Sequence, residues 1–180
     1  MRKTGLSLGL LSASLLLGAL SFGVAMEPAN RPPVRGQAEK LFQDGNYQEA
    51  YEAFRARVLD PAADGRTVGN DLEMALQCLP PLDKVNESDA LLEKAVEIQA
   101  KHWRLLWAAA RSYQNLPHYG YVVSGKFERG DRRGGGNIVN ANERDRVRAL
   151  QLMVQAVPLV RQDDNHAEGG QFFLGLAELL

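Results

Sequence analysis

Cysteine is almost missing from this sequence, with Cys78 the only one in 180 residues. One cysteine cannot pair within its own chain, so a disulfide framework is excluded and the apolar core must hold the fold. No cysteine stands near residue 25, so a lipid anchor at the end of the leader is not expected. Leu79 beside Cys78 and Ala75 one turn away predict that this thiol is a small buried apolar group.

An excess of charge is lacking as well. The chain has 21 Lys and Arg against 22 Asp and Glu, a net charge of −1. A general nucleic-acid binder is expected to be basic, so no nucleic-acid partner is predicted.

Catalytic and metal-binding patterns are also missing from the sequence. His102, His118 and His166 lie far apart, without an H-E-x-x-H or Cys/His spacing, so no metal site is predicted. Beyond the Leu-rich leader, no serine stands in a G-x-S-x-G setting. We therefore expect no enzymatic activity and no cofactor.

The run "KFERGDRRGGGN" (residues 126–137) has the glycines of a phosphate loop without its lysine and hydroxyl residue. A nucleotide site is therefore not predicted. Arg129, Arg132 and Arg133 are candidates for contact with an anion or an acidic partner. The favoured interpretation is a solvated loop, because Glu128 and Asp131 dilute the positive charge.

Residues 1–25 match the pattern of an export signal. "MRK" is followed by an uncharged, Leu-rich stretch, and "GVA" puts small residues before a cleavage site after Ala25. An uncleaved anchor stays open, because residues 4–26 are uncharged and nearly long enough to span a bilayer. We expect an exported protein, periplasmic, cell-surface or extracellular, that meets a membrane only through this segment if it is not cleaved. A Pro-rich linker (26–33) follows.

Apolar residues recur at helical spacing from residue 34 onward. The expected helices cover roughly residues 34–42, 47–58, 71–79, 88–100, 103–115, 140–157 and 165–180. Three Asn/Glu pairs are expected to cap helix starts, beginning at Asn70, Asn140 and Asn165. In the sixth helix, the apolar stripe that we expect to face the core consists of Val147, Leu150, Val154 and Val157, and Pro158 is expected to end that helix. Short amphipathic helices must bury such stripes against one another.

The stretch "VRGQAEKLFQDGNYQEAYEAFRARVLDP" (34–61) resembles a tetratricopeptide repeat. Ala38, the turn Gly45-Asn46-Tyr47, Ala50 and Phe54 match the small and aromatic positions of that family. Arg57 stands where a small residue is usual, and Pro61 comes one residue early. "HWRLLWAAARSYQNLP" (102–117) resembles the first helix of a second repeat.

The resemblance implies an all-α fold of stacked antiparallel helical hairpins over residues 34–180. An unrelated helical bundle stays open as the alternative. Residues 118–141 form an insertion that is long for a helix connection. Its segment "YGYVVSGKFERG" is too apolar for a free loop, so we expect an ordered insertion with a small hairpin that covers one end of the stack.

The run from Leu116 to Val160 resembles the N-terminal, repeat-like part of large exported bacterial alpha-2-macroglobulin-like proteins. That resemblance implies a leading fragment of a protease-trapping protein that continues past "QFFLGLAELL". Cys78 lacks the following Gly-Glu-Gln of a thioester, so the inhibitory machinery itself is not expected here.

These patterns favour a module that binds a protein or peptide, or other domains of its own polypeptide. The candidate partner-binding residues, each expected in the core or in a groove, are Tyr47, Tyr51, Trp103, Trp107 and Tyr113, together with the arginines Arg129, Arg132 and Arg133. A helical enzyme or cofactor-binding domain, or a purely structural spacer, stays open as the alternative.

Overall fold

The computed structural model describes residues 34–131, 133–134 and 136–180. The predicted leader (1–25), the linker (26–33) and Arg132 lie outside the described residues. The described residues all belong to the contact unit Pro32–Leu180.

Helices make up most of the described chain. The α-helices are α1 (Arg35–Gln43), α2 (Tyr47–Val58), α3 (Val68–Gln77), α4 (Ser88–Ile98), α5 (Trp103–Asn115), α6 (Asn142–Val160) and α7 (His166–Leu179). Two short 3-10 helices, η1 (Pro80–Leu82) and η2 (Val85–Glu87), connect α3 to α4. The mainly helical prediction is confirmed. The all-α fold class is wrong in its strict form, because three strands form a sheet between α5 and α6.

The ends of the helices follow the predictions only in part. Gly45 has a φ of 80°, a left-handed conformation that ends α1 and turns the chain into α2. Asn165 caps α7 by accepting a hydrogen bond from the backbone N–H of Glu168. The other two predicted caps are wrong. Asn70 lies inside α3, and Asn140 ends a strand, where its side chain accepts a backbone N–H two residues on.

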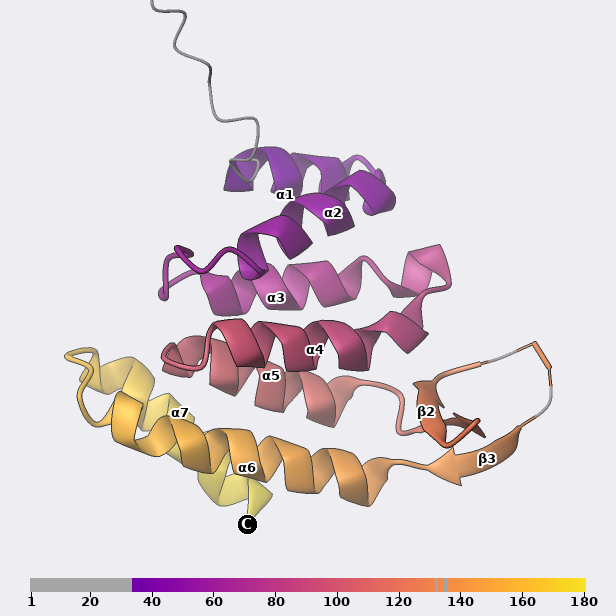
Figure 1. Ribbon diagram of the computed structural model, residues 1–180. Helices are drawn as coiled ribbons and strands as arrows, with labels where there is room; N and C mark the ends of the chain where they lie inside the picture. Colours follow the sequence, from indigo (N-terminus) through magenta and orange to yellow (C-terminus); the bar gives the residue numbers. More distant parts are fainter. Residues whose placement is uncertain (1–33, 132, 135) are drawn as a thin grey trace, which may run out of the picture. The chain divides into compact units, whose positions relative to one another are not determined.

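The helices are stacked one on another, from α1 and α2 at one end to α6 and α7 at the other (Figure 1). Along this stack α2 packs on α3, α3 on α5, and α5 on α6. Trp103 and Trp107 of α5 each contact Phe172 of α7, with ring centroids 5.9 Å apart. Helices α3, α5 and α7 thus follow one another along one side, while α4 and α6 lie in front of α5 and α7 in Figure 1.

The contact between α2 and α3 departs from a purely apolar packing. Ala38, Ala50 and Phe54 are fully buried, so the small residues do let α1 and α2 approach closely. Arg57, however, donates from Nε to Oδ2 of Asp71 in α3 at 3.0 Å. An ion pair therefore stands at the position where a small residue was expected.

Helix α6 faces the core with a different stripe from the predicted one. Its buried apolar residues are Ala149, Leu152, Met153, Ala156 and Val160. Val147 is 43% and Val154 58% exposed, so the prediction that these two face the core is wrong. The other two predicted members fare better, since Leu150 is half-buried and Val157 packs against the core. Two stripes at helical spacing compete in this helix, and the one with alanines allows α5 to come closer. Pro158 does not end the helix, which continues to Val160.

The sheet consists of β1 (Tyr119–Val123), β2 (Lys126–Arg129) and β3 (Asn137–Asn140), all antiparallel, in the order β2-β1-β3. The two-residue turn between β1 and β2 has positive φ at both Ser124 and Gly125, as a twisted hairpin requires. The predicted hairpin is therefore confirmed, and β3 extends it to a sheet.

Candidate functional site

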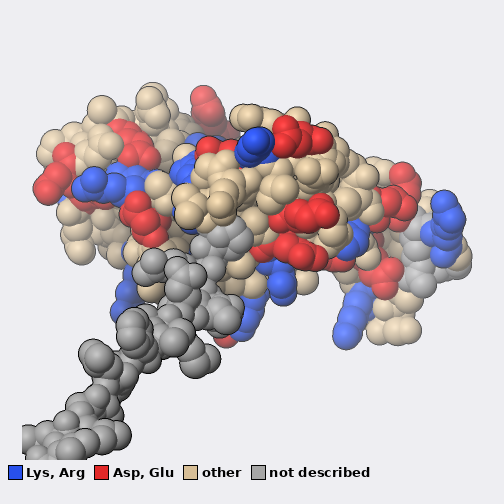
Figure 2. All heavy atoms as spheres, turned by 90° about the horizontal axis from the view of Figure 1, so that it is seen from above, with Lys and Arg blue, Asp and Glu red and all other residues tan. Residues whose placement is uncertain are grey.

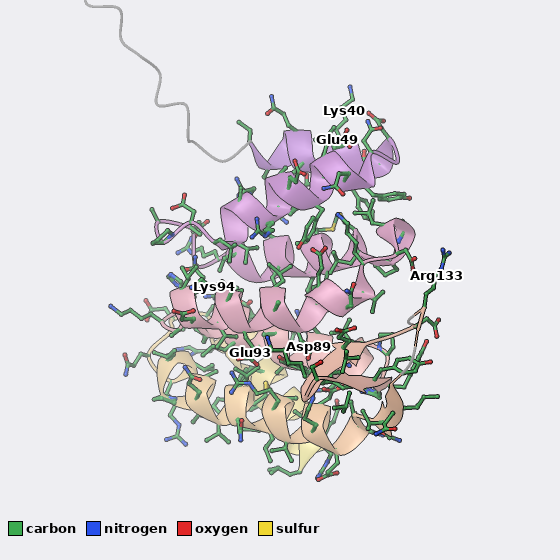
Figure 3. All side chains as sticks on the ribbon, turned by 45° about the vertical axis from the view of Figure 1, so that its right-hand side comes forward. Lys40, Glu49, Asp89, Glu93, Lys94 and Arg133 are labelled. Carbon is green, nitrogen blue, oxygen red and sulfur yellow. The ribbon has the colours of Figure 1, made fainter. Side chains whose placement is uncertain are left out.

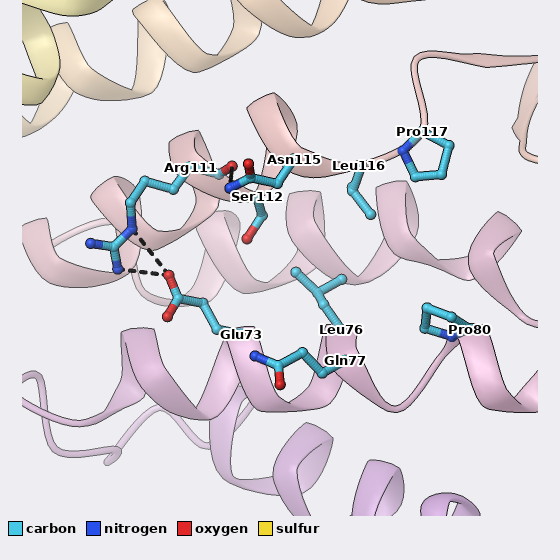
Figure 4. A pocket seen from close by; sticks show the side chains of 9 residues that line it. All are labelled: Glu73, Leu76, Gln77, Pro80, Arg111, Ser112, Asn115, Leu116 and Pro117. Atoms are coloured by element: carbon cyan, nitrogen blue, oxygen red, sulfur yellow. Dashed lines mark hydrogen bonds and ion pairs between the residues drawn. The ribbon is translucent and has the colours of Figure 1, made fainter.

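An open hollow of about 430 Å³ lies between α3 and α5. Figure 4 shows its lining residues, which come from the C-terminal halves of both helices and the segments that follow them. Leu76 lies toward the middle of the view, and polar side chains such as Gln77 and Asn115 surround it. We call this the α3–α5 hollow.

A second hollow, of about 320 Å³, lies between α5 and α7. Arg111 and Asn115 line both hollows, so the two adjoin on the surface of α5. The α5–α7 hollow adds the amides of Gln114 and Gln171 and the carboxylate of Glu178. We call the two hollows together the groove.

Arg111 is held firmly in the middle of the groove. Its Nε and Nη2 donate to Oε1 of Glu73 at 3.1 and 2.6 Å (Figure 4). Its guanidinium also lies 4.4 Å above the ring of Trp107. A planar cation fixed by a carboxylate and an aromatic ring keeps its orientation without a ligand.

The predicted aromatic residues lie mostly in the core rather than in the groove. Tyr51, Trp103 and Tyr113 are buried, and Tyr47 is half-buried against Phe42. Trp107 is half-buried and is the only one of the predicted five that lines either hollow of the groove.

The buried tyrosine hydroxyls bond to acids on other elements. Tyr51 donates to Glu87 at 3.1 Å, and burial together with that carboxylate raises the pKa of Tyr51 to about 12. Tyr113 donates to Glu93 at 2.7 Å, and burial and this carboxylate raise its pKa in the same direction. Burial raises the pKa of Cys78 to about 11, as expected for an inert thiol. These hydroxyls and this thiol serve the fold.

Arg129 does not belong to a solvated loop. It ends β2 with 1% of its surface exposed, and all its N–H groups are used. It donates to Asp145 of α6 at 2.7 and 2.8 Å, to Asp89 of α4 at 2.8 and 3.0 Å, and to the carbonyl of Pro117 at 2.6 Å. The prediction that Arg129 offers its charge to a partner is wrong, because the guanidinium fixes the insertion to two helices.

Asp145 is the centre of this cluster. It also accepts hydrogen bonds from Arg144 at 2.8 and 3.1 Å, and its Oδ2 lies 2.9 Å from Nδ1 of His118. Burial alone would raise the pKa of Asp145, but the hydrogen bonds from Arg129, His118 and Arg144 more than offset it and lower the pKa. Asp145 is therefore held as a carboxylate.

Helices α4 and α6 are joined by matched charges. Asp89 and Glu93, one turn apart on α4, point toward α6 (Figure 3). Asp89 pairs with Arg144, and Glu93 accepts from Arg148 at 2.6 Å. The charges of "ERDRVR" thus connect two helices instead of forming only a solvated face.

Arg133 is exposed and projects from the loop between β2 and β3 (Figure 3). It stays available to a partner, whereas Arg132 lies outside the described residues. Acidic and basic side chains are interspersed over the face seen in Figure 2, and neither sign gathers into one large patch there.

Sequence reasoning missed most of the groove. Trp107, Arg111 and Asn115 recur at i, i+4 and i+8 along α5, a spacing that marks one helix face. That signal could have been found. What it could not reveal is that the neighbours of this face are α3 and α7, rather than α4.

Among the described residues, no group of His, Cys, Asp or Glu side chains is placed to hold a metal ion. In the same part of the chain no helix combines the length and the apolar content needed to cross a membrane. Comparison with protein families, curated proteins and solved structures found no match to this chain.

Proposed function

We propose that this chain is a non-enzymatic interaction module that binds a protein or peptide partner in the groove formed by α3, α5 and α7. The observation that carries the proposal is the groove's lining. Asn115, Gln77, Gln114 and Gln171 face it with amide groups, which can both donate to and accept from a peptide backbone. Among the described residues, none of these four side-chain amides bonds to another element, and Asn115 bonds only within α5, so they are free to bond a partner.

The tetratricopeptide-like stacking belongs to the same proposal. The buried Ala38 and Ala50, the turn at Gly45 and the row of α3, α5 and α7 support it. In stacked helical hairpins the inner helices present one extended surface to a partner. The sheet would border that surface at the end where α5 leads into β1.

Export and a place in an alpha-2-macroglobulin-like protease-trapping protein are proposals carried by the sequence alone. They are compatible with a binding role. A purely structural spacer is the main rival, because it also needs no catalytic group, but it gives no reason for a lined groove.

Site-specific cross-linking in the cells that make the protein would test the binding role. Benzoylphenylalanine placed at Asn115 should form adducts with another protein, because this side chain lines both hollows. The same photoreactive residue at Gln155, exposed on α6, serves as the control. Equal labelling from both positions, or none from Asn115, would argue for the spacer.

A further inference from the structure

One donor in the α5–α7 hollow has no partner within the described chain. Trp103 and Trp107 are stacked neighbours in α5, with ring centroids 5.9 Å apart. Nε1 of Trp103 donates to Asp163 at 2.8 Å. Nε1 of Trp107 has no acceptor among the described residues. The buried side-chain atoms without a partner in that part of the chain are Oδ1 of Asp71 and Oγ of Ser88, so Nε1 of Trp107 is not buried and reaches solvent.

The surroundings of Trp107 leave its N–H edge as the open part. Arg111 covers one face of the ring, Trp103 stacks beside it, and Phe172 meets it edge-on. A Cβ at Gly175 would lie 3.6 Å from Nε1 of Trp107. The glycine therefore keeps a side chain away from this donor, although a helix interior disfavours glycine.

A second donor lies beside the first. Arg111 uses Nε and Nη2 for Glu73, and its Nη1 has no hydrogen bond to a described residue. The hollow thus offers an indole N–H and a guanidinium N–H. Both are held by stacking and by the Glu73 ion pair before any ligand arrives.

The charge around these donors selects among possible acceptors. Glu73 balances Arg111 at 2.6 Å, and Glu178 adds a carboxylate without an ion pair to a described residue. The charged lining of the groove is therefore negative by one. This excess negative charge repels a carboxylate or a phosphate, whereas it does not repel a neutral carbonyl.

We infer that the α5–α7 hollow binds a backbone carbonyl of an internal, extended peptide segment that is neutral or basic, not a free C-terminus or an acidic segment. This rests on the proposed function and names the partner's chemistry. The amides of Gln114 and Gln171 beside the hollow can bond the neighbouring peptide groups. The adjoining α3–α5 hollow gives room for the rest of the segment.

The probes are two random dodecapeptide libraries, one tethered at both ends and one with free C-termini, each selected on the purified full chain. Selected sequences are then synthesised with an amidated end and with a free carboxylate, and affinities are measured by fluorescence anisotropy. We expect the tethered library to yield binders with no or positive net charge, and the amidated peptides to bind at least as tightly as the free acids.

Three variants test the site itself. Trp107→Phe keeps the stacked ring but removes the N–H, and should weaken binding about fivefold, the equivalent of one hydrogen bond. Gly175→Leu fills the hollow while improving helix propensity, and should weaken binding at least about tenfold. Gly170→Leu, on the same helix with open space around it, is the matched control and should bind like the wild type.

The outcomes separate this inference from the proposed function. Peptides that bind equally well to Gly175→Leu and Trp107→Phe would overturn the assignment of the hollow and leave the module free to bind elsewhere. Selection of acidic peptides, or of binders that need a free carboxylate, would overturn the charge argument. Failure of both libraries to give any binder would count against the proposed function as well.

Discussion

Two buried aspartates join elements of this fold, and they do so in different ways. Asp71 of α3 accepts from Arg57 of α2 at 3.0 Å and lies 3.5 Å from Nε of Arg35 in α1. Both arginines are partly exposed, and Oδ1 of Asp71 has no hydrogen-bond partner among the described residues. Asp145 instead accepts two short hydrogen bonds from Arg129 of β2, whose side chain is fully buried.

The difference shows what each cluster joins. Asp71 ties together consecutive helices that already share an apolar contact, so its ion pairs supplement the packing. Arg129 and Asp145 connect the sheet to α4 and α6, and no residue of the three described strands belongs to the buried hydrophobic cluster. A buried charge destabilises the fold unless its partners are present. One substitution in the Arg129–Asp145 cluster should therefore lower the free energy of unfolding more than one in the Asp71 cluster.

The largest expected effect comes from Arg129→Met. It keeps an unbranched stem as far as the position of Nε, removes the guanidinium, and leaves Asp145 and Asp89 without their main donor. We expect a loss of about 3–5 kcal/mol in the free energy of unfolding, as for other broken buried pairs. Urea unfolding followed by circular dichroism measures it.

Arg144→Met is the matched control for this substitution. Arg144 contacts the same two aspartates but is 44% exposed, so its loss should cost less than about 1 kcal/mol. Equal destabilisation by the two variants would mean that burial of Arg129 does not set its contribution.

The corresponding change in the first cluster is Arg57→Ala. It should destabilise by about 1–2 kcal/mol, because Asp71 keeps Arg35 nearby and Arg57 is partly solvated already. The same urea titration applies, with Arg55→Ala on the exposed side of α2 as a control expected within about 0.5 kcal/mol of wild type. A loss as large as that of Arg129→Met would remove the distinction between the two clusters.

The helices could largely be predicted because local signals fix them. The spacing of apolar residues, Gly45 and the cap at Asn165 all act within one or two turns of chain. The choice of buried face in α6 could not be predicted. Both stripes have helical spacing, and only the approach of α5 decides that Ala149 faces inward while Val154 stays exposed.

The insertion and the groove depend on contacts that are distant in sequence. Arg129 meets Asp89 at a separation of 40 residues, so its burial has no local signal. Arg111 meets Glu73 at a separation of 38 residues. The hairpin of the insertion could be predicted from its apolar residues and from Ser124-Gly125. The docking of the sheet and the lining of the groove could not, because both depend on how distant helices pack.

The smallest expected effect is on the pH dependence of stability. Because the native pKa of Asp145 lies below its usual range, the unfolded chain binds a proton there at a higher pH than the folded chain does. The stabilisation is therefore fully present above about pH 5 and is lost as pH falls toward the native pKa, by at most about 1.4 kcal/mol per pH unit for one group.

Arg129→Met removes the strongest donor to Asp145, so unfolding free energies measured from pH 7 to 3.5 should fall less steeply in this variant than in the wild type. Lys94→Met, at an exposed position of α4, should keep the wild-type slope. If Arg129→Met also keeps it, Asp145 is not the group whose protonation couples acid to the loss of the docked sheet.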